Sequence, residues 1–234
     1  MRILAIGAHP DDVEINCGGT LLKYRDAGHE VFLVLTTSGN IGSNTLGSRE
    51  EIANTRESEQ LEAAKLYPAD VKFLRYDDQY LVDTPETRAT IAEAIRWANP
   101  SVIFTHDPVD MSADHYMTAI LVIRVMQTLT GVNVPSEYSP VQSKPSLFHW
   151  DTPAGHHFKP EVYVDITEVV EKKLEAVSRH RSQNAWLSQF QTYSLVDRCR
   201  IQSQFRGLQN GSDYAEAFRA YRNHGFMPRL SDLP

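Results

Sequence analysis

One imidazole and two carboxylates stand close together near the start of this chain, directly after a short apolar run. His9, Asp11 and Asp12 follow the buried-type segment 3–6, and Glu14 lies one helical turn further on. Imidazole nitrogens and carboxylate oxygens are ligands that zinc accepts in proteins. The cluster therefore indicates a metal site, with helix capping as the ordinary alternative for the two aspartates.

A catalytic zinc takes about three protein ligands and a water, so His9 and Asp12 need one more partner. His115 is the best candidate, because Asp114 and His115 open a helix after the loop that follows an apolar run at 101–105. A histidine taken at random is more often a solvated or core residue. Ligands bind at the carboxyl edge of open α/β sheets, and two strand ends carrying such residues favour a shared site there.

Apolar runs alternate with helical patterns along the chain, and Pro10 must end the first strand because it has no N–H to donate. This alternation predicts an α/β, Rossmann-like fold in which helices cover both faces of a mostly parallel sheet. The expected strands are 3–6, 30–35, 71–74, 101–105, 147–150 and 162–165. The expected helices are 20–27, 50–66, 84–98, 114–129 and 168–179.

The C-terminal part is less periodic than the rest. Residues 131–160 are rich in proline, and residues 186–234 are polar, with one helix expected at 212–221. We see no composition change that marks a domain boundary. The expectation is a single α/β domain over residues 1–234 with an irregular C-terminal part.

The composition excludes several kinds of partner. The chain has 234 residues and a net charge of −7 without a basic block, which argues against nucleic acid or an anionic membrane as the main partner. No apolar run has membrane-spanning length, and no secretory leader is recognised at the start. Cys17 and Cys199 form no zinc spacing and no disulfide framework. A small-molecule partner and a cytoplasmic location are expected.

The opening motif resembles the signature of the LmbE-like (PIG-L-like) de-N-acetylases, which are zinc hydrolases acting on N-acetylglucosamine-type sugars. The residues that carry the resemblance are Ala8-His9-Pro10-Asp11-Asp12-Val13-Glu14 and Cys17-Gly18-Gly19-Thr20-Leu21, then Arg56-Glu57-Ser58-Glu59, Tyr76-Asp77-Asp78, the stretch from Asp110 to His115, Tyr163-Val164-Asp165-Ile166-Thr167 and His180-Arg181-Ser182-Gln183. The resemblance covers about residues 1–185. Residues 186–234 form an extension without a match.

The resemblance implies a role for each residue at the strand ends. His9, Asp12 and His115 match the zinc ligands, and Asp11 matches the general base beside them. The implied activity is hydrolysis of an N-acetyl group by a metal-activated water. The resemblance also suggests a homo-oligomer, either a trimer or a hexamer.

Further residues match positions outside the ligand set. Arg56 and Asp78 match substrate-binding positions, and Asp114 is expected to orient an imidazole or a nearby charge. The ordinary alternative for Arg56 is a solvated residue on an exposed helix face. Asp165 and His180 also have ordinary alternatives to a functional role. Asp165 could cap the following helix, and His180 could be a surface residue with satisfied hydrogen bonds.

One position departs from the family pattern. Many members have a histidine three positions before the last ligand, assigned to the oxyanion or the leaving amine, and this chain has Ser112 there. His106, His156 and His157 are candidates to replace it. We expect His106 to take this catalytic role, because it leaves the fourth strand at the same sheet edge as His9.

These observations predict a zinc-dependent hydrolase that removes an acetyl group from a small N-acetylated amino sugar or its conjugate. The alternatives are an amidase that cleaves a larger acyl group from a sugar–thiol conjugate, and a metal-binding scaffold without catalysis. A nucleotide-binding Rossmann module is disfavoured, because residues 6–11 lack the glycine-rich phosphate turn and contain an acid where a pyrophosphate would bind.

Overall fold

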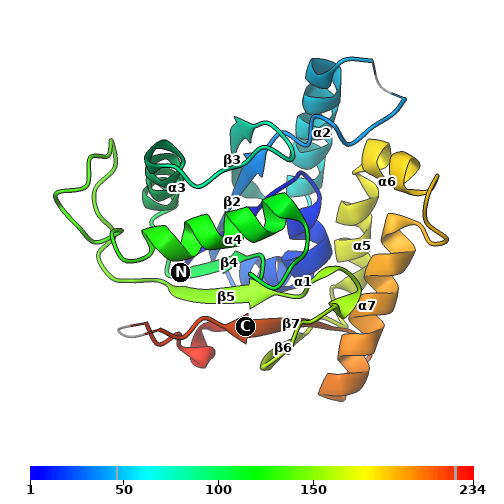
Figure 1. Ribbon diagram of the computed structural model, residues 1–234. Helices are drawn as coiled ribbons and strands as arrows, with labels where there is room; N and C mark the ends of the chain where they lie inside the picture. Colours follow the sequence, from blue (N-terminus) through cyan, green and yellow to red (C-terminus); the bar gives the residue numbers. More distant parts are fainter. Residues whose placement is uncertain (46, 224–225) are drawn as a thin grey trace.

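The computed structural model describes residues 1–45, 47–223 and 226–234. Within this part the strands form one seven-stranded sheet in the order β3-β2-β1-β4-β5-β7-β6 (Figure 1). The strands are β1 Arg2–Gly7, β2 Glu30–Thr37, β3 Ala69–Tyr76, β4 Val102–Thr105, β5 Ser146–Trp150, β6 Val162–Asp165 and β7 Ala215–Ala220. Strands β1 to β5 pair in parallel and β7 is antiparallel to both of its neighbours. The predicted α/β class with a mostly parallel sheet is confirmed.

Helices pack on both faces of this sheet, as the alternating strands and helices require. The α-helices are α1 Asp12–Asp26, α2 Arg49–Ala64, α3 Pro85–Ala98, α4 Ala113–Val125, α5 Val170–Ser178, α6 Arg181–Leu187 and α7 Leu195–Asn210, and the 3-10 helices are η1 Pro153–Gly155 and η2 Leu230–Asp232. None of the helices in the described ranges is long and apolar enough to cross a membrane.

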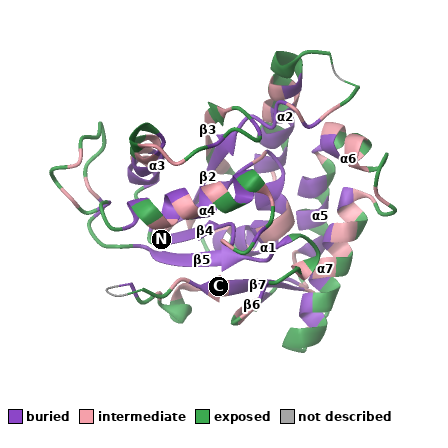
Figure 2. Ribbon diagram, viewed as in Figure 1, coloured by how far each residue is buried: buried purple, intermediate pink, exposed green. Residues whose placement is uncertain are grey.

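Two apolar clusters form the core, one on each side of the sheet. Successive strand residues point to opposite faces, so Ile3 and Ala5 pack with α1, α5 and α7, whereas Leu4 and Ile6 pack with α3 and α4. Strand β1 is buried from Ile3 to Gly7, and Figure 2 shows its neighbour β4 and the next strand β5 buried along their length. The sheet is therefore a rigid platform for the loops that leave its carboxyl edge.

Helix α1 begins earlier than the sequence suggested. The expected helix was 20–27, but α1 runs continuously through Gly18 and Gly19 from Asp12. A Cβ at position 19 would lie 2.7 Å from Cγ2 of Ile166. Gly19 is therefore explained by the close approach of Ile166 rather than by a break in the helix.

The C-terminal part is regular, and the predicted helix at 212–221 is wrong. Its centre forms strand β7, which pairs with β5 and β6 inside the sheet. Alanine and glutamate favour helices in isolation, but the ladder hydrogen bonds of two flanking strands override this weak preference. Helices α6 and α7, which the sequence did not predict, precede β7 and line the site described below.

Candidate active site

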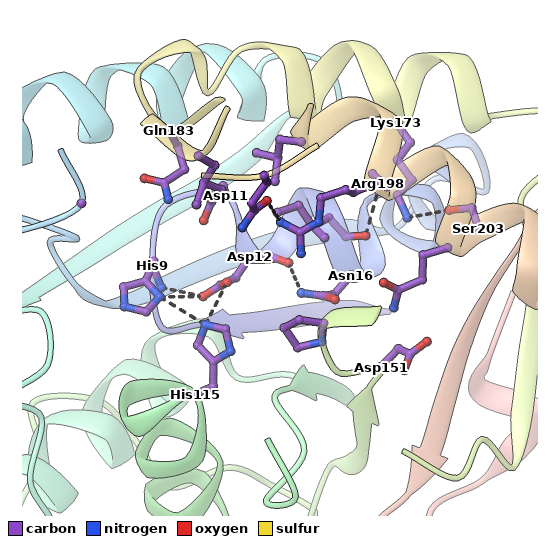
Figure 3. A pocket seen from close by; sticks show the side chains of 18 of the residues that line it. His9, Asp11, Asp12, Asn16, His115, Asp151, Lys173, Gln183, Arg198 and Ser203 are labelled. Carbon is purple, nitrogen blue, oxygen red and sulfur yellow. Dashed lines mark hydrogen bonds and ion pairs between the residues drawn. The ribbon is translucent and has the colours of Figure 1, made fainter. Parts of the chain in front are cut away.

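The predicted site residues meet at the carboxyl edge of the sheet, at the point where the order of the strands reverses. Strand β1 pairs with β2 on one side and β4 on the other, which makes their carboxyl ends a switch point. His9 and Asp12 follow β1, and His115 comes from α4 after β4. Figure 3 shows the three side chains converging at one end of a cavity of about 540 Å³.

The three predicted metal ligands present one atom each to the same small space. Nδ1 of His9 lies 3.3 Å from Nε2 of His115. Oxygens of Asp12 lie 3.5 Å from the first nitrogen and 3.3 Å from the second. Two imidazole nitrogens bound to one tetrahedral zinc at about 2.0–2.1 Å lie roughly 3.3 Å apart. The spacing therefore fits a tetrahedral ion.

Carboxylates stand behind both imidazoles. Nδ1 of His115 is 2.9 Å from Oδ2 of Asp110, and Nε2 of His9 is 3.1 Å from Asp78 and 3.2 Å from Asp114. Each carboxylate attracts the ring N–H to its side, which leaves the lone pair on the front nitrogen. The two front nitrogens then face each other across 3.3 Å, an arrangement that a proton held between them or a bound metal ion stabilises.

The electrostatics of the cluster agree with this interpretation. Burial lowers the pKa of His9, but the carboxylates of Asp114, Asp12 and Asp78 outweigh it and hold the pKa well above its usual value. The same balance of burial against Asp12 and Asp110 raises the pKa of His115 to about 9. The negative field that retains these protons also attracts a divalent cation.

Asp11 sits on a strained turn beside the metal-ligand cluster. Its φ of 120° lies in a region that residues other than glycine rarely adopt, and its side chain makes no capping hydrogen bond. The capping interpretation therefore does not hold for Asp11. Its carboxylate lines the cavity instead. Burial raises the pKa of Asp11 to about 6, although nearby Arg56 lowers it.

Arg56 is 3% exposed, so the interpretation as a solvated surface residue is wrong. Its Nη2 donates to the carbonyl of Pro10 at 2.7 Å and lies 3.4 Å from Oδ1 of Asp11, and its Nη1 donates to the carbonyl of Gly39 at 3.1 Å. A Cβ at Gly39 would lie 2.3 Å from Nη1, so glycine makes room for the guanidinium. Arg56 lines the cavity, and its substrate-binding role stays a prediction.

Asp78 and Asp114 both lie against His9. Asp114 occupies the position that its predicted orienting role requires, and its Oδ2 also accepts the backbone N–H of Gln79 at 2.7 Å. Asp78 lines the cavity but is already 3.1 Å from Nε2 of His9. If Asp78 binds substrate as predicted, its carboxylate would contact both the substrate and the imidazole of His9.

His106 lies beneath the ligand cluster and does not line the cavity. It is 1% exposed and stacks on His115 with ring centroids 4.0 Å apart. Its Nε2 is 3.2 Å from Oδ2 of Asp12, and its Nδ1 accepts the indole N–H of Trp150 at 3.2 Å. His156 and His157, the other candidates, are exposed and do not line the cavity either.

A buried polar network supports Asp11 from behind. Glu14 accepts hydrogen bonds from Tyr67 and from Gln60, and lies 3.1 Å from Nε2 of His180. Gln60 in turn accepts the backbone N–H of Asp11 at 3.3 Å. Glu14 and His180 belong to the quoted motifs, whereas nothing in the local sequence singled out Gln60 and Tyr67. Asp110, within the quoted 110–115 stretch, likewise gained its role only from its contact with His115.

The chain is similar to known proteins over most of its length. The model of the GlcNAc-PI de-N-acetylase (PIG-L) family matches residues 4–126. The diacetylchitobiose deacetylase of Thermococcus kodakarensis is 30% identical over 232 residues, covering 93% of this chain and 82% of its own.

The chain belongs to the PIG-L de-N-acetylase family.

Two solved structures add the fold of the whole chain. The N,N'-diacetylchitobiose deacetylase of Pyrococcus horikoshii is 28% identical, with a TM-score of 0.82 over 98% of this chain and 87% of its own. The 4-carboxy-2-hydroxymuconate hydratase of Pseudomonas putida is 20% identical, with a TM-score of 0.83 over 98% of both chains, and this likeness concerns the fold alone. The predicted resemblance and the enzyme class of N-deacetylases are confirmed by the family match. Family membership by itself names neither the metal nor the substrate.

Proposed function

We propose that this chain is a zinc-dependent hydrolase that removes the acetyl group from a small N-acetylated amino sugar or its conjugate. The observation that carries the proposal is the pair of imidazole nitrogens 3.3 Å apart beside Asp12, with Asp11 on the cavity wall next to them. Relatives named as deacetylases of diacetylchitobiose support a sugar of the N-acetylglucosamine type.

The donor set fits zinc. Two imidazoles and one carboxylate are a set that catalytic zinc sites use, and the carboxylates behind both rings fix their orientation. When bound, the ion would polarise the acetyl carbonyl and lower the pKa of a water toward neutrality. His9, Asp12 and His115 would hold it.

Asp11 would supply the proton transfers that amide hydrolysis needs. Its carboxylate would accept a proton from the attacking water and then deliver a proton to the departing nitrogen, so that the products are acetate and a free amine. Arg56 holds this carboxylate in place and the strained turn at Asp11 aims it at the cavity. The raised pKa of Asp11 suits a group that both takes and returns a proton near neutral pH.

The proposal is tested by measuring zinc content and acetate release together. We expect about one zinc per chain, and acetate release from N-acetylglucosamine or N,N'-diacetylchitobiose that stops on chelation and returns with zinc. Amine release without acetate, from a sugar–thiol conjugate with a larger acyl group, would favour the amidase alternative. Bound zinc without turnover of either the N-acetylated sugars or the sugar–thiol conjugate would favour the non-catalytic scaffold.

Arg56 gives a prediction about pH. Changing Arg56 to Gln removes the positive charge that lowers the pKa of Asp11, so that pKa rises. Because the base must be ionised, we expect the acid limb of the kcat/KM profile to move to higher pH. Arg49→Gln, an exposed change on the same helix, should leave the limb in place. An unmoved limb in Arg56→Gln would remove Arg56 from this role.

His106 gives a prediction about the metal. We propose that it acts through Asp12, because its Nε2 is 3.2 Å from Oδ2 of that ligand and its ring does not line the cavity. His106→Ala should weaken zinc binding by roughly 10- to 100-fold, the usual cost of losing a ligand's partner. At saturating zinc the turnover should largely recover. Unchanged zinc affinity with crippled turnover would instead support the oxyanion role predicted from the sequence.

A further inference from the structure

Helix α6, Arg181–Leu187, lies on the side of the cavity away from α4. In Figure 3, Gln183 lies at the upper left and His115 at the lower left, with Asp11 and Asp12 at heights between them. Gln183 and Trp186 both line the cavity. They are three residues apart and therefore share one face of the helix. The family model ends at residue 126, and although Gln183 belongs to the quoted motif His180-Arg181-Ser182-Gln183, the resemblance implied no role for it.

The side-chain amide of Gln183 has no partner among the described residues. Gln183 is 7% exposed, and its Oε1 is fully buried without a hydrogen bond. A Cβ at Gly42 would lie 3.1 Å from this oxygen and 2.6 Å from Nη1 of Arg56, so glycine keeps the space between them open. A buried amide left without partners costs stability, and native proteins keep few of them without a reason.

Trp186 repeats this pattern on the next turn. Its indole Nε1 is buried and has no hydrogen-bond acceptor in the described part of the chain. An indole N–H can only donate, whereas the amide of Gln183 both accepts and donates. Gln183 and Trp186 thus line the cavity and carry an acceptor and a donor that no group in the described part of the chain uses.

We propose that Gln183 and Trp186 form a subsite for the hydroxyl groups of the substrate's sugar ring. This inference rests on the proposed function and identifies what recognises the sugar beyond its acetyl group. Both atoms are covered in this conformation, and the side chains must turn to present them to the cavity. A hydroxyl then donates to Oε1 of Gln183 and accepts from the indole of Trp186, whereas a carboxylate only accepts and leaves Oε1 unpaired. A polyhydroxylated ring therefore satisfies both side chains. The subsite lies beside Arg56 and hence next to Asp11.

The first experiment compares substrates with and without hydroxyls. Gln183→Leu is assayed on N-acetylglucosamine, on its 3-, 4- and 6-deoxy derivatives and on N-cyclohexylacetamide, which has the amide on a ring without hydroxyls. We expect kcat/KM for N-acetylglucosamine to fall by roughly 10- to 100-fold, mainly through KM. For one deoxy derivative and for N-cyclohexylacetamide, we expect Gln183→Leu to have the same kcat/KM as the wild type. An equal loss on N-cyclohexylacetamide would mean that Gln183 is structural and would overturn the proposal.

Two further variants sharpen this comparison. Trp186→Phe keeps an aromatic ring but removes the N–H, and we expect it to lower kcat/KM for N-acetylglucosamine by about 3- to 10-fold. Gln189→Leu changes an exposed glutamine just beyond the same helix that does not line the cavity, and its kinetics should match the wild type. Loss in the Gln189 variant equal to that in the Gln183 variant would contradict a specific subsite.

The second experiment does not depend on turnover. Calorimetric titration of N-acetylglucosamine into the zinc-loaded protein should show binding that is weaker by roughly 10-fold or more in Gln183→Leu than in the wild type. Binding with this difference but no acetate release would refute the proposed function and keep the subsite. Equal binding by wild type and variant, or no binding by either, would overturn the subsite. Thermal melting of each variant confirms that it is folded.

Discussion

Replacing Asp11 by asparagine will leave zinc bound and reduce turnover by roughly two to four orders of magnitude, the usual contribution of a general base. Asparagine keeps the shape of the side chain and the contact with Arg56, but it cannot take a proton. The carboxylate of Asp11 is not among the three groups that face one another at 3.3–3.5 Å, so the metal should remain. Zinc content and acetate release on the same sample measure both effects.

A matched control separates the role of Asp11 from a general loss of charge. Asp70 is exposed at the start of β3, at the opposite edge of the sheet from the site, and Asp70→Asn should keep full activity. If Asp11→Asn loses its zinc, then Asp11 is a ligand and the roles of the two aspartates have been exchanged. If it keeps near-normal turnover, another group is the base.

Replacing His115 by alanine will remove most of the zinc and with it all measurable acetate release. The ring is the only group that α4 contributes to the set His9, Asp12 and His115, and no other described histidine lines the cavity besides His9. Three protein ligands are the usual number for a catalytic zinc, so the loss of one should exceed the roughly 10- to 100-fold effect of losing an outer partner. Elemental analysis at equal protein concentration measures it.

A change at Asp110 should produce a smaller loss of zinc affinity than the loss of His115. Its Oδ2 lies 2.9 Å from Nδ1 of His115, so Asp110→Asn loosens the ligand without removing it. We expect its zinc affinity to fall by about 10- to 100-fold, between the wild type and His115→Ala. His156→Ala, an exposed histidine outside the cavity, should keep the wild-type affinity. Full zinc occupancy in His115→Ala would refute the ligand assignment.

The N-terminal elements were predictable because their signals are local. Apolar runs long enough for a buried strand placed β1 to β5 close to their observed bounds, and a helical pattern followed each of the first four. Strand β7 was not predictable in this way. Its sequence, Ala-Glu-Ala-Phe-Arg-Ala, suits a helix, and only the pairing with β5 and β6 makes it a strand. Helix α7 was missed because Leu195 is its only large apolar buried residue, and the other buried positions are Cys199, Ser203, Arg206 and Gly207.

By itself, the sequence determined the fold class and the group of residues that meet at the sheet edge. His9, Asp11 and Asp12 are neighbours in the chain, and a parallel sheet brings the end of β4, with His115 beyond it, to the same edge. These conclusions require only that strands alternating with helices run parallel and that imidazole and carboxylate groups bind metals, and both can be inferred from short stretches.

The tertiary structure alone decided what the more distant residues contact. Arg56 proved to be buried against Pro10 and Asp11, and His106 proved to lie beneath Asp12 rather than in the cavity. It also placed Gln183 with an unpartnered amide in the cavity wall. The physical reason is that burial and hydrogen-bond partners depend on how elements pack across 45 to 94 residues of chain, and no local pattern of polarity records that packing.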